Sequence, residues 1–365
     1  MSISHSTVLP FASAPDSLCI LRLSAVGDVC HTVPVVRSIQ RQWPGTRITW
    51  IIGRLEAGLV ADIPGIEFII FDKSRGWRAY TDLRRLMRGR RFDALLQMQV
   101  SLRASVASLL IEAPIRLGFD RERARDFQWL FTNARIAARP REHVMEGLFG
   151  FARALGVMDL TPVWDIPIPA EAVEFARNWI PEEGGTMVIS PCSSNRSRNW
   201  RNWSAAGYAR IVDHAAERYG MRTLLTGGPT ELEREYGEKI GALARHSPVN
   251  LIGRTTLKQL LALLDRAVLL ISPDSGPVHM ATAVGTPVIG LYATSNPDRT
   301  GPWSSRQWVV NRYPEALREE VGKEVEQVPW GRRVRSPTAM QRITAGEIEE
   351  KLREIVLDTR PEQST

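Results

Sequence analysis

The chain has 365 residues, of which 44% are hydrophobic and 24% charged, a balance typical of globular proteins and unlike that of disordered chains. This length exceeds what one hydrophobic core usually organises, so the sequence predicts two domains. The formal charge of +7 indicates an anionic partner such as nucleic acid, anionic lipid or a phosphorylated substrate. Arginine supplies most of this charge, and a GC-rich genome would enrich arginine without any function.

Several protein classes are excluded at this stage. No apolar run approaches the roughly 20 residues that span a bilayer, and residues 1–17 lack the features of a secretory signal; we expect them to form a disordered tail. The three cysteines, Cys19, Cys30 and Cys192, show no CxxC spacing, which argues against a zinc site or a disulfide framework. We therefore expect a cytoplasmic protein.

Residues 18–170 alternate short apolar runs with helical patterns. Such alternation predicts a parallel sheet covered by helices on both faces, with right-handed crossovers. The expected strands are 18–23, 47–52, 67–71, 94–98 and 115–118.

A second alternating set occupies residues 171–340. Its expected strands are 186–190, 223–226, 250–252, 268–271 and 287–292. Residues 341–365 hold an amphipathic helix at 343–357, which we expect to pack back onto the N-terminal domain. The predicted fold class is α/β, with two Rossmann-like, doubly wound domains facing a central cleft. Such sheets bind ligands at the carboxyl ends of their strands.

The segment Ser272–His279 has the strongest local pattern, because it joins an apolar strand to a helix. Gly276 allows close approach of a ligand to the backbone, and Pro277 suits a first helical turn. The free N–H groups at such a helix start form an anion site. Asp274 can then accept hydrogen bonds from sugar hydroxyls and His279 can reach a phosphate. A plain helix capped by Asp274 or Ser275 explains the segment equally well.

Further motifs follow one another in a characteristic order. They are Leu21–Pro34 (LRLSAVGDVCHTVP), Thr223–Pro229 (TLLTGGP), Leu251–Leu257 (LIGRTTL), Asp274–His279 (DSGPVH), Gly285–Pro287 (GTP) and Thr300–Pro302 (TGP). As an ordered set they resemble glycosyltransferase family 9, the lipopolysaccharide heptosyltransferases. The resemblance implies a GT-B fold and transfer of heptose from ADP-heptose to the lipopolysaccharide inner core, with inversion and without metal or other cofactor. It also implies that Asp28 is the catalytic base, whereas the local sequence allows Asp28 to be only a helix cap.

The resemblance also indicates the donor site. It implies that Ser193 and Ser194 meet the donor phosphates, and that Thr255 lies where backbone groups contact adenine. Relatives carry a lysine shortly before a tryptophan, but this chain has Arg198 and Arg201 two residues before Trp200 and Trp203. Either arginine would preserve the charge while changing the contact geometry. A solvated loop is the alternative for both.

The stretch 73–91 contains Lys73 and seven arginines. Helically spaced arginines often form a solvated face, but an anionic, lipid-linked saccharide acceptor and the inner face of the cytoplasmic membrane would both be attracted to them. We predict that Arg75, Arg78, Arg103 and Arg125 bind the acceptor, the last two by resemblance. Tryptophans interleaved with arginine also occur in nucleic-acid sites, but no such signature accompanies them here and nucleic acid is not expected.

Two other functions stay open. One is a GT-B enzyme with a different nucleotide sugar or acceptor, and the other is a non-catalytic nucleotide-binding module. The presence of Asp28 favours an enzyme.

Overall fold

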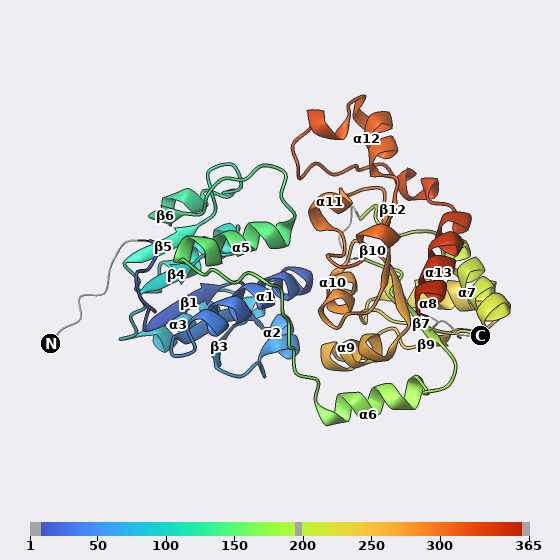
Figure 1. Cartoon of the computed structure of the whole chain (residues 1–365), viewed down its shortest axis with the longest axis horizontal. Coiled ribbons are helices and arrows are strands. Elements are labelled where there is room, and N and C mark those ends of the chain that lie inside the picture. The colour runs from blue at the N-terminus through green and yellow to red at the C-terminus, as the bar shows by residue number, and fades with distance from the viewer. Residues whose placement is uncertain (1–8, 194–198, 360–365) are drawn as a thin grey trace, which may run out of the picture. The chain divides into compact units, whose positions relative to one another are not determined.

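The computed structural model describes residues 9–193 and 199–359, and the chain divides into two units between Pro167 and Ile168. Each unit contains one six-stranded parallel sheet with helices on both faces (Figure 1). The predicted fold class of two doubly wound α/β domains is confirmed, and the boundary lies three residues before the predicted one.

The first sheet has the strand order β3-β2-β1-β4-β5-β6, which is the order of a dinucleotide-binding Rossmann sheet. The central strand β1 is buried along its whole length, as expected for a strand covered on both faces. The strands are β1 (Ser17–Leu21), β2 (Arg47–Gly53), β3 (Ile66–Phe71), β4 (Ala94–Leu96), β5 (Ile115–Gly118) and β6 (Ala134–Arg135).

Helices cover this sheet in two layers. The helices α3 and α4 pack on one face through Ala79, Leu83 and Ala104, while α1 packs with α5. The helices are α1 (Val26–Gln42), α2 (Arg54–Val60), α3 (Trp77–Met87), α4 (Leu102–Ser108) and α5 (Val144–Leu155), with short 3-10 turns η1 (Lys73–Arg75) and η2 (Gln128–Leu130).

The second sheet has the order β12-β11-β10-β7-β8-β9. Counted from its own first strand, this is the same order as in the first sheet. The strands are β7 (Thr186–Ile189), β8 (Arg222–Leu225), β9 (Val249–Asn250), β10 (Leu269–Pro273), β11 (Val288–Tyr292) and β12 (Val310–Asn311).

The helices of the second unit also lie on both faces of its sheet. They are α6 (Ala170–Trp179), α7 (Ala205–Tyr219), α8 (Glu231–Leu243), α9 (Leu257–Arg266), α10 (Gly276–Ala283), α11 (Pro297–Thr300), α12 (Tyr313–Val321) and α13 (Ala345–Thr359), with the 3-10 turns η3 (Arg306–Trp308), η4 (Val325–Gln327) and η5 (Ala339–Arg342). Within the ranges that the structure describes, no helix has both the length and the apolar character needed to cross a membrane.

Two boundary predictions need correction. The final helix α13 packs within the second unit, where Ile348 and Leu352 join the core, because its apolar stripe faces α7 and β11. The N-terminal tail is also shorter than predicted. The N–H of Phe11 donates to the carbonyl oxygen of Leu155 (3.0 Å), and the Phe11 ring contacts Trp43 edge-on, so the chain is ordered before β1 begins.

The shared strand order determines where ligands bind. In both sheets the order of connection reverses beside the first strand, between β1 and β4 and between β7 and β10. Loops that leave the carboxyl ends of these strand pairs form the crevice that such folds use for ligands. Asp28 follows β1 and Asp274 follows β10, so each lies at the switch point of its unit.

Candidate functional site

In the first unit, the candidate site is the turn that joins β1 to α1. The Nη2 of Arg22 lies 2.5 Å from Oδ2 of Asp28, in an ion pair whose arginine is 11% exposed and whose aspartate is 41% exposed. The N–H of Ala25 also donates to Oδ2 (3.3 Å), so Asp28 does help to cap α1. Among residues 9–193 and 199–359, no group donates a hydrogen bond to its second oxygen, Oδ1. The capping and catalytic readings are therefore compatible, because they use different oxygens.

This turn is held against the neighbouring strand of the switch point. Oε1 of Gln99, which follows β4, accepts from the N–H groups of Leu23 (2.8 Å) and Ser24 (3.0 Å). The guanidinium of Arg22 donates to the carbonyl oxygen of Met98, and the indole of Trp50 donates to the carbonyl oxygen of Arg22 (3.1 Å). The loops after β1 and β4 thus fix the direction in which Asp28 points.

Sequence reasoning missed Glu56 as a member of this group. Glu56 lies on α2 and is 6% exposed. Burial raises the pKa of Glu56, and the nearby Asp28 carboxylate raises it further, while Lys73 and Arg22 act in the opposite direction. A pKa shifted by burial and by a neighbouring charge is common at functional sites. The local sequence around Glu56 shows no pattern that predicts its burial, because the helical segment is short.

The cysteine and histidines near Asp28 have different environments. Burial, and after it the Asp28 carboxylate, raise the pKa of Cys30 to about 12, which excludes Cys30 as a nucleophile near neutral pH. His31 lies on α1 just beyond Asp28, and its ring contacts that of His143 edge-on at 5.4 Å. Nδ1 of His143 accepts from the N–H of Met145 (3.2 Å), so His143 caps α5.

In the second unit, the candidate site is the turn that joins β10 to α10. Ser275 occupies the N-cap position, but its hydroxyl makes no hydrogen bond to the helix. It pairs instead with the hydroxyl of Ser272 (2.8 Å), which reaches the carbonyl oxygen of Ser190 (2.8 Å). Ser272 therefore links β10 to the residue that follows β7, and Ser275 leaves the first turn of α10 without a side-chain cap. Uncapped N–H groups at a helix start favour binding of an anion.

Arg201 holds this turn in place. Its Nη1 donates to the carbonyl oxygen of Asp274 (2.8 Å) and lies 3.4 Å from Oδ2 of the same residue. Nε of Arg201 and the hydroxyl of Ser193 both donate to Oδ1 of Asn199 (3.4 and 2.9 Å). The structure thus brings together Ser193, Arg201, Asp274 and Ser275, four of the predicted donor residues, around the switch point of the second sheet.

The other predicted donor residues lie around this core. Gly276 is the first residue of α10 and His279 is buried one turn later. Thr255 is half-buried and precedes Thr256, whose side chain is the one that caps α9. Ser194 and Arg198 lie outside the residues that the structure describes.

The loop after β11 contains two buried polar residues that were not among the predicted site residues. Ser295 and Asn296 are each 5% exposed, and neither the hydroxyl of Ser295 nor Nδ2 of Asn296 has a hydrogen-bond partner among the described residues. Buried polar groups are nearly always paired. The ring of Tyr292, which precedes this loop, lies close enough to Asp274 for the carboxylate to add to the effect of burial in raising the Tyr292 pKa. The loop is therefore adjacent to the Asp274 turn and offers groups that a ligand can satisfy.

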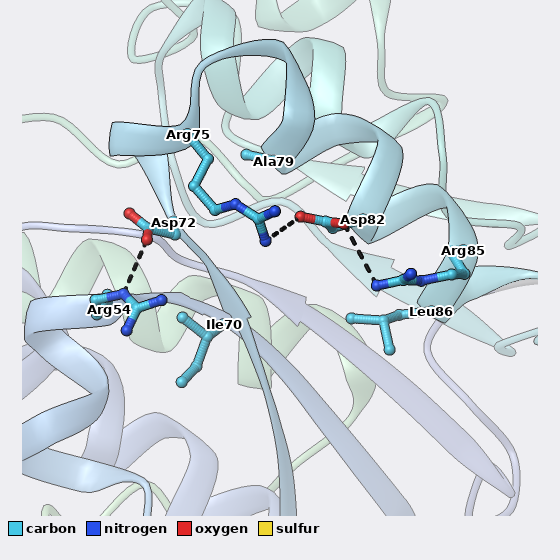
Figure 2. Close-up of a pocket in the computed structure, with 8 residues that line it drawn as sticks. All are labelled: Arg54, Ile70, Asp72, Arg75, Ala79, Asp82, Arg85 and Leu86. Atoms are coloured by element: carbon cyan, nitrogen blue, oxygen red, sulfur yellow. Dashed lines mark hydrogen bonds and ion pairs between the residues drawn. The ribbon is translucent and has the colours of Figure 1, made fainter.

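The predicted acceptor arginines differ in their contacts. A cavity of about 180 Å³ lies beside β3 and α3. Figure 2 shows the guanidinium of Arg75 pointing at Asp82 in its lining. Arg75 is ion-paired with Asp82 at 2.5 Å, a pairing that the basic pattern of the sequence did not reveal. Arg78, Arg103 and Arg125 are exposed and form no ion pair with another described residue, so their guanidiniums are accessible.

The described ranges contain no group of three or more His, Cys, Asp or Glu side chains arranged to hold a metal ion. The two switch-point turns are instead built from carboxylates, arginines and hydroxyl groups. This donor set suits the recognition of hydroxyl-rich and phosphate-bearing ligands.

Comparison with known proteins agrees with this geometry. In solved structures, a family 9 glycosyl transferase from Veillonella parvula matches with a TM-score of 0.77 at 21% identity, over 94% of this chain and 98% of that chain. The structure of E. coli heptosyltransferase WaaC with ADP matches with a TM-score of 0.71 at 19% identity, over 93% and 99%. The fold is the GT-B fold.

The sequence comparisons identify the class and the family of the protein. The family model for glycosyltransferase family 9 (heptosyltransferase) matches residues 80–328. Lipopolysaccharide core heptosyltransferase OpsX of Haemophilus influenzae is 43% identical over 333 residues, which cover 91% of this chain and 95% of the relative. The protein is therefore a glycosyltransferase, and the chain belongs to glycosyltransferase family 9, as the ordered motifs predicted.

Proposed function

We propose that this protein transfers a heptose from ADP-heptose to the inner core of lipopolysaccharide, with inversion and without a metal ion or other cofactor. The observation that carries the proposal is the pair of switch-point turns. One turn presents the half-exposed carboxylate of Asp28, and in the other Arg201 binds Asp274 at the start of α10. The 43% identity to a lipopolysaccharide core heptosyltransferase and the likeness to a heptosyltransferase structure with ADP support the choice of donor and acceptor.

The donor binds to the second unit in this proposal. The diphosphate lies at the start of α10, where the N–H groups of Gly276 and Val278 and the hydroxyl of Ser193 stabilise its charge. Asp274 accepts hydrogen bonds from the sugar hydroxyls, and Arg201 keeps its carboxylate in position. Thr255 lies beside the adenine. Arg201, rather than a lysine, supplies the positive charge in the described part of this loop.

Asp28 is the general base in this proposal. Oδ1 takes the proton of the acceptor hydroxyl while the oxygen attacks the anomeric carbon, and the bond from that carbon to the phosphate oxygen breaks with its electron pair leaving on ADP. A single displacement of this kind inverts the anomeric centre. Arg22 holds the other carboxylate oxygen, so the base is oriented before the acceptor arrives.

The acceptor is an anionic, lipid-linked saccharide. Arg78, Arg103 and Arg125 present accessible guanidiniums to it, whereas Arg75 would first have to leave Asp82. The reaction takes place in the cytoplasm at the inner face of the cytoplasmic membrane, and nucleic acid has no part in it.

One experiment tests both substrates. The purified protein is incubated with ADP-heptose and heptose-free core acceptor, with and without EDTA, and the products are identified by mass spectrometry. We expect heptosylated acceptor and ADP, formed equally with EDTA, and a larger thermal stabilisation by ADP than by UDP or GDP. Larger stabilisation by UDP would refute the donor assignment, and activity abolished by EDTA and restored by magnesium would refute the metal-independent mechanism.

A further inference from the structure

The segment Asp126–Leu130 of the first unit has an inverted pattern of exposure. Phe127, Trp129 and Leu130 are 63%, 44% and 64% exposed, while Gln128 between them is fully buried. Three large apolar side chains in four residues are thus presented to solvent. Exposed apolar groups that lie together mark interaction surfaces, whereas scattered ones do not.

This exposure is not the result of a loose loop. Nε2 of the buried Gln128 donates to the carbonyl oxygens of Gln97 (2.8 Å) and Gln99 (3.2 Å), and its Oε1 accepts from the N–H of Phe119 (3.2 Å). The amide side chain is therefore satisfied inside the protein. Because Gln128 is anchored in this way, its apolar neighbours are held outward.

Other exposed groups continue this surface along α4 and α3. Leu102, which begins α4 just after Gln99, is 56% exposed, and Trp77, which begins α3, is 78% exposed. The two helices are linked near these positions, since the hydroxyl of Tyr80 donates to the carbonyl oxygen of Arg103 (3.4 Å) and the rings of Trp77 and Tyr80 lie 5.3 Å apart.

The charge of this surface is positive. Six exposed arginines on α3, α4 and the loop before Phe127 form no ion pair with another described residue, against two such exposed carboxylates, Glu122 and Asp126. The six are Arg78, Arg84, Arg88, Arg103, Arg121 and Arg125. A surface that combines exposed tryptophan, phenylalanine and leucine with unpaired arginines is complementary to an anionic lipid leaflet.

We propose that this surface, formed by Phe127, Trp129 and Leu130 with Trp77, Leu102 and the six arginines, docks the protein onto an anionic lipid leaflet. The apolar side chains enter the interfacial layer and the arginines contact the phosphate headgroups. The inference rests on the proposed function in one respect: a lipid-linked acceptor lies in such a leaflet, so docking brings the acceptor arginines to their substrate.

The test uses the full chain and vesicle flotation. Vesicles of phosphatidylethanolamine with phosphatidylglycerol are compared with vesicles of phosphatidylcholine alone, at low and high salt. The variant is Phe127→Asn with Leu130→Ser, because asparagine tolerates the positive φ of residue 127 (+58°). Met158→Ser is the matched control, since Met158 is an 83% exposed apolar residue of the same unit outside the proposed surface.

We expect the protein to float with the anionic vesicles only, and less at high salt. The double variant should lose about tenfold or more in vesicle partitioning, and Met158→Ser should behave as wild type. Failure of the wild type to bind anionic vesicles, or unchanged binding by the double variant, would overturn the proposal. A concentration-dependent dimer that the double variant abolishes would show that a second copy covers the surface instead.

Transfer assays separate this inference from the proposed function. The double variant should retain wild-type transfer to a deacylated, water-soluble acceptor and lose it on an acceptor embedded in vesicles. If the wild type transfers heptose to neither acceptor, the proposed function fails, while flotation still decides whether the surface binds lipid.

Discussion

Replacement of Asp28 by asparagine tests the proposed base most directly. Asparagine keeps an oxygen that can accept from the N–H of Ala25 but cannot take a proton. Loss of a general base lowers a rate by about 10²–10⁴-fold, which corresponds to roughly 3–5.5 kcal/mol in activation free energy. We expect a fall of this size in kcat for ADP release in the presence of acceptor.

The cost in stability should be much smaller. Asp28 is 41% exposed, so solvent screens its ion pair with Arg22 and the loss is about 1 kcal/mol or less. A change of that size lowers the Tm of a unit of this length by about 2–4 °C. Affinity for ADP should not change, because the proposed donor site is built from residues of the second unit. Calorimetric titration with ADP and a thermal melt measure both quantities on the same sample.

Asp159→Asn is the matched control. Asp159 forms an ion pair with Arg41 in the same unit (3.1 Å) and is 55% exposed, but it has no place in the site. Asp159→Asn should lower stability about as little as Asp28→Asn does, and it should keep full activity. If Asp28→Asn retained more than about a tenth of the wild-type kcat, a fall far short of that expected for a base, Asp28 would not be the base. If Asp159→Asn lost as much activity, the effect would reflect stability alone.

Three further predictions concern Arg201, Glu56 and Gly253. Arg201→Lys should weaken ADP binding about tenfold, because one ammonium group cannot contact both Asp274 and Asn199 as the guanidinium does; unchanged affinity by calorimetry would contradict this. The pKa of Glu56 is raised in the folded protein, so its contribution to stability is present below the unfolded pKa and is lost as pH rises through the folded pKa. Glu56→Gln should therefore leave stability unchanged in acid and increase it near neutral pH. Urea unfolding at several pH values measures this difference. Gly253 has a φ of +73° and an added Cβ would lie 3.1 Å from a backbone carbon, so Gly253→Ala should destabilise by about 1–2 kcal/mol; Gly241→Ala, in an open position of α8, should instead stabilise.

The sequence was most informative where local chemistry and chain position agree. The Asp274 turn could be predicted because proline, serine and glycine follow an apolar strand and precede a helix, and this order admits few backbone conformations. The two parallel sheets could be predicted from the alternation of strands and helices, but β6 and β12 were missed because two-residue strands are too short to show periodicity.

The features that the sequence did not reveal depend on contacts between distant residues. The apolar stripe of α13 showed that the helix packs on something, but not that its partner is α7. The basic stretch around α3 gave no sign that Arg75 is paired with Asp82. The burial of Glu56 depends on its position beneath the β1 turn, which is set by the pairing of β2 with β1 rather than by neighbouring residues.

Each of the two turns contains an ion pair between an arginine and an aspartate, but the pairs differ in how exposed the carboxylate is. In the first unit the arginine is buried and the carboxylate is 41% exposed, whereas in the second unit the carboxylate of Asp274 is 9% exposed and Arg201 contacts both its side chain and its backbone. An accessible carboxylate with one unpaired oxygen is suited to accept a proton, while a buried carboxylate fixed by an arginine is suited to orient hydroxyl groups without changing charge. The strand order that both units share places a carboxylate at each switch point, and burial then separates a candidate base, Asp28, from a candidate sugar-binding residue, Asp274.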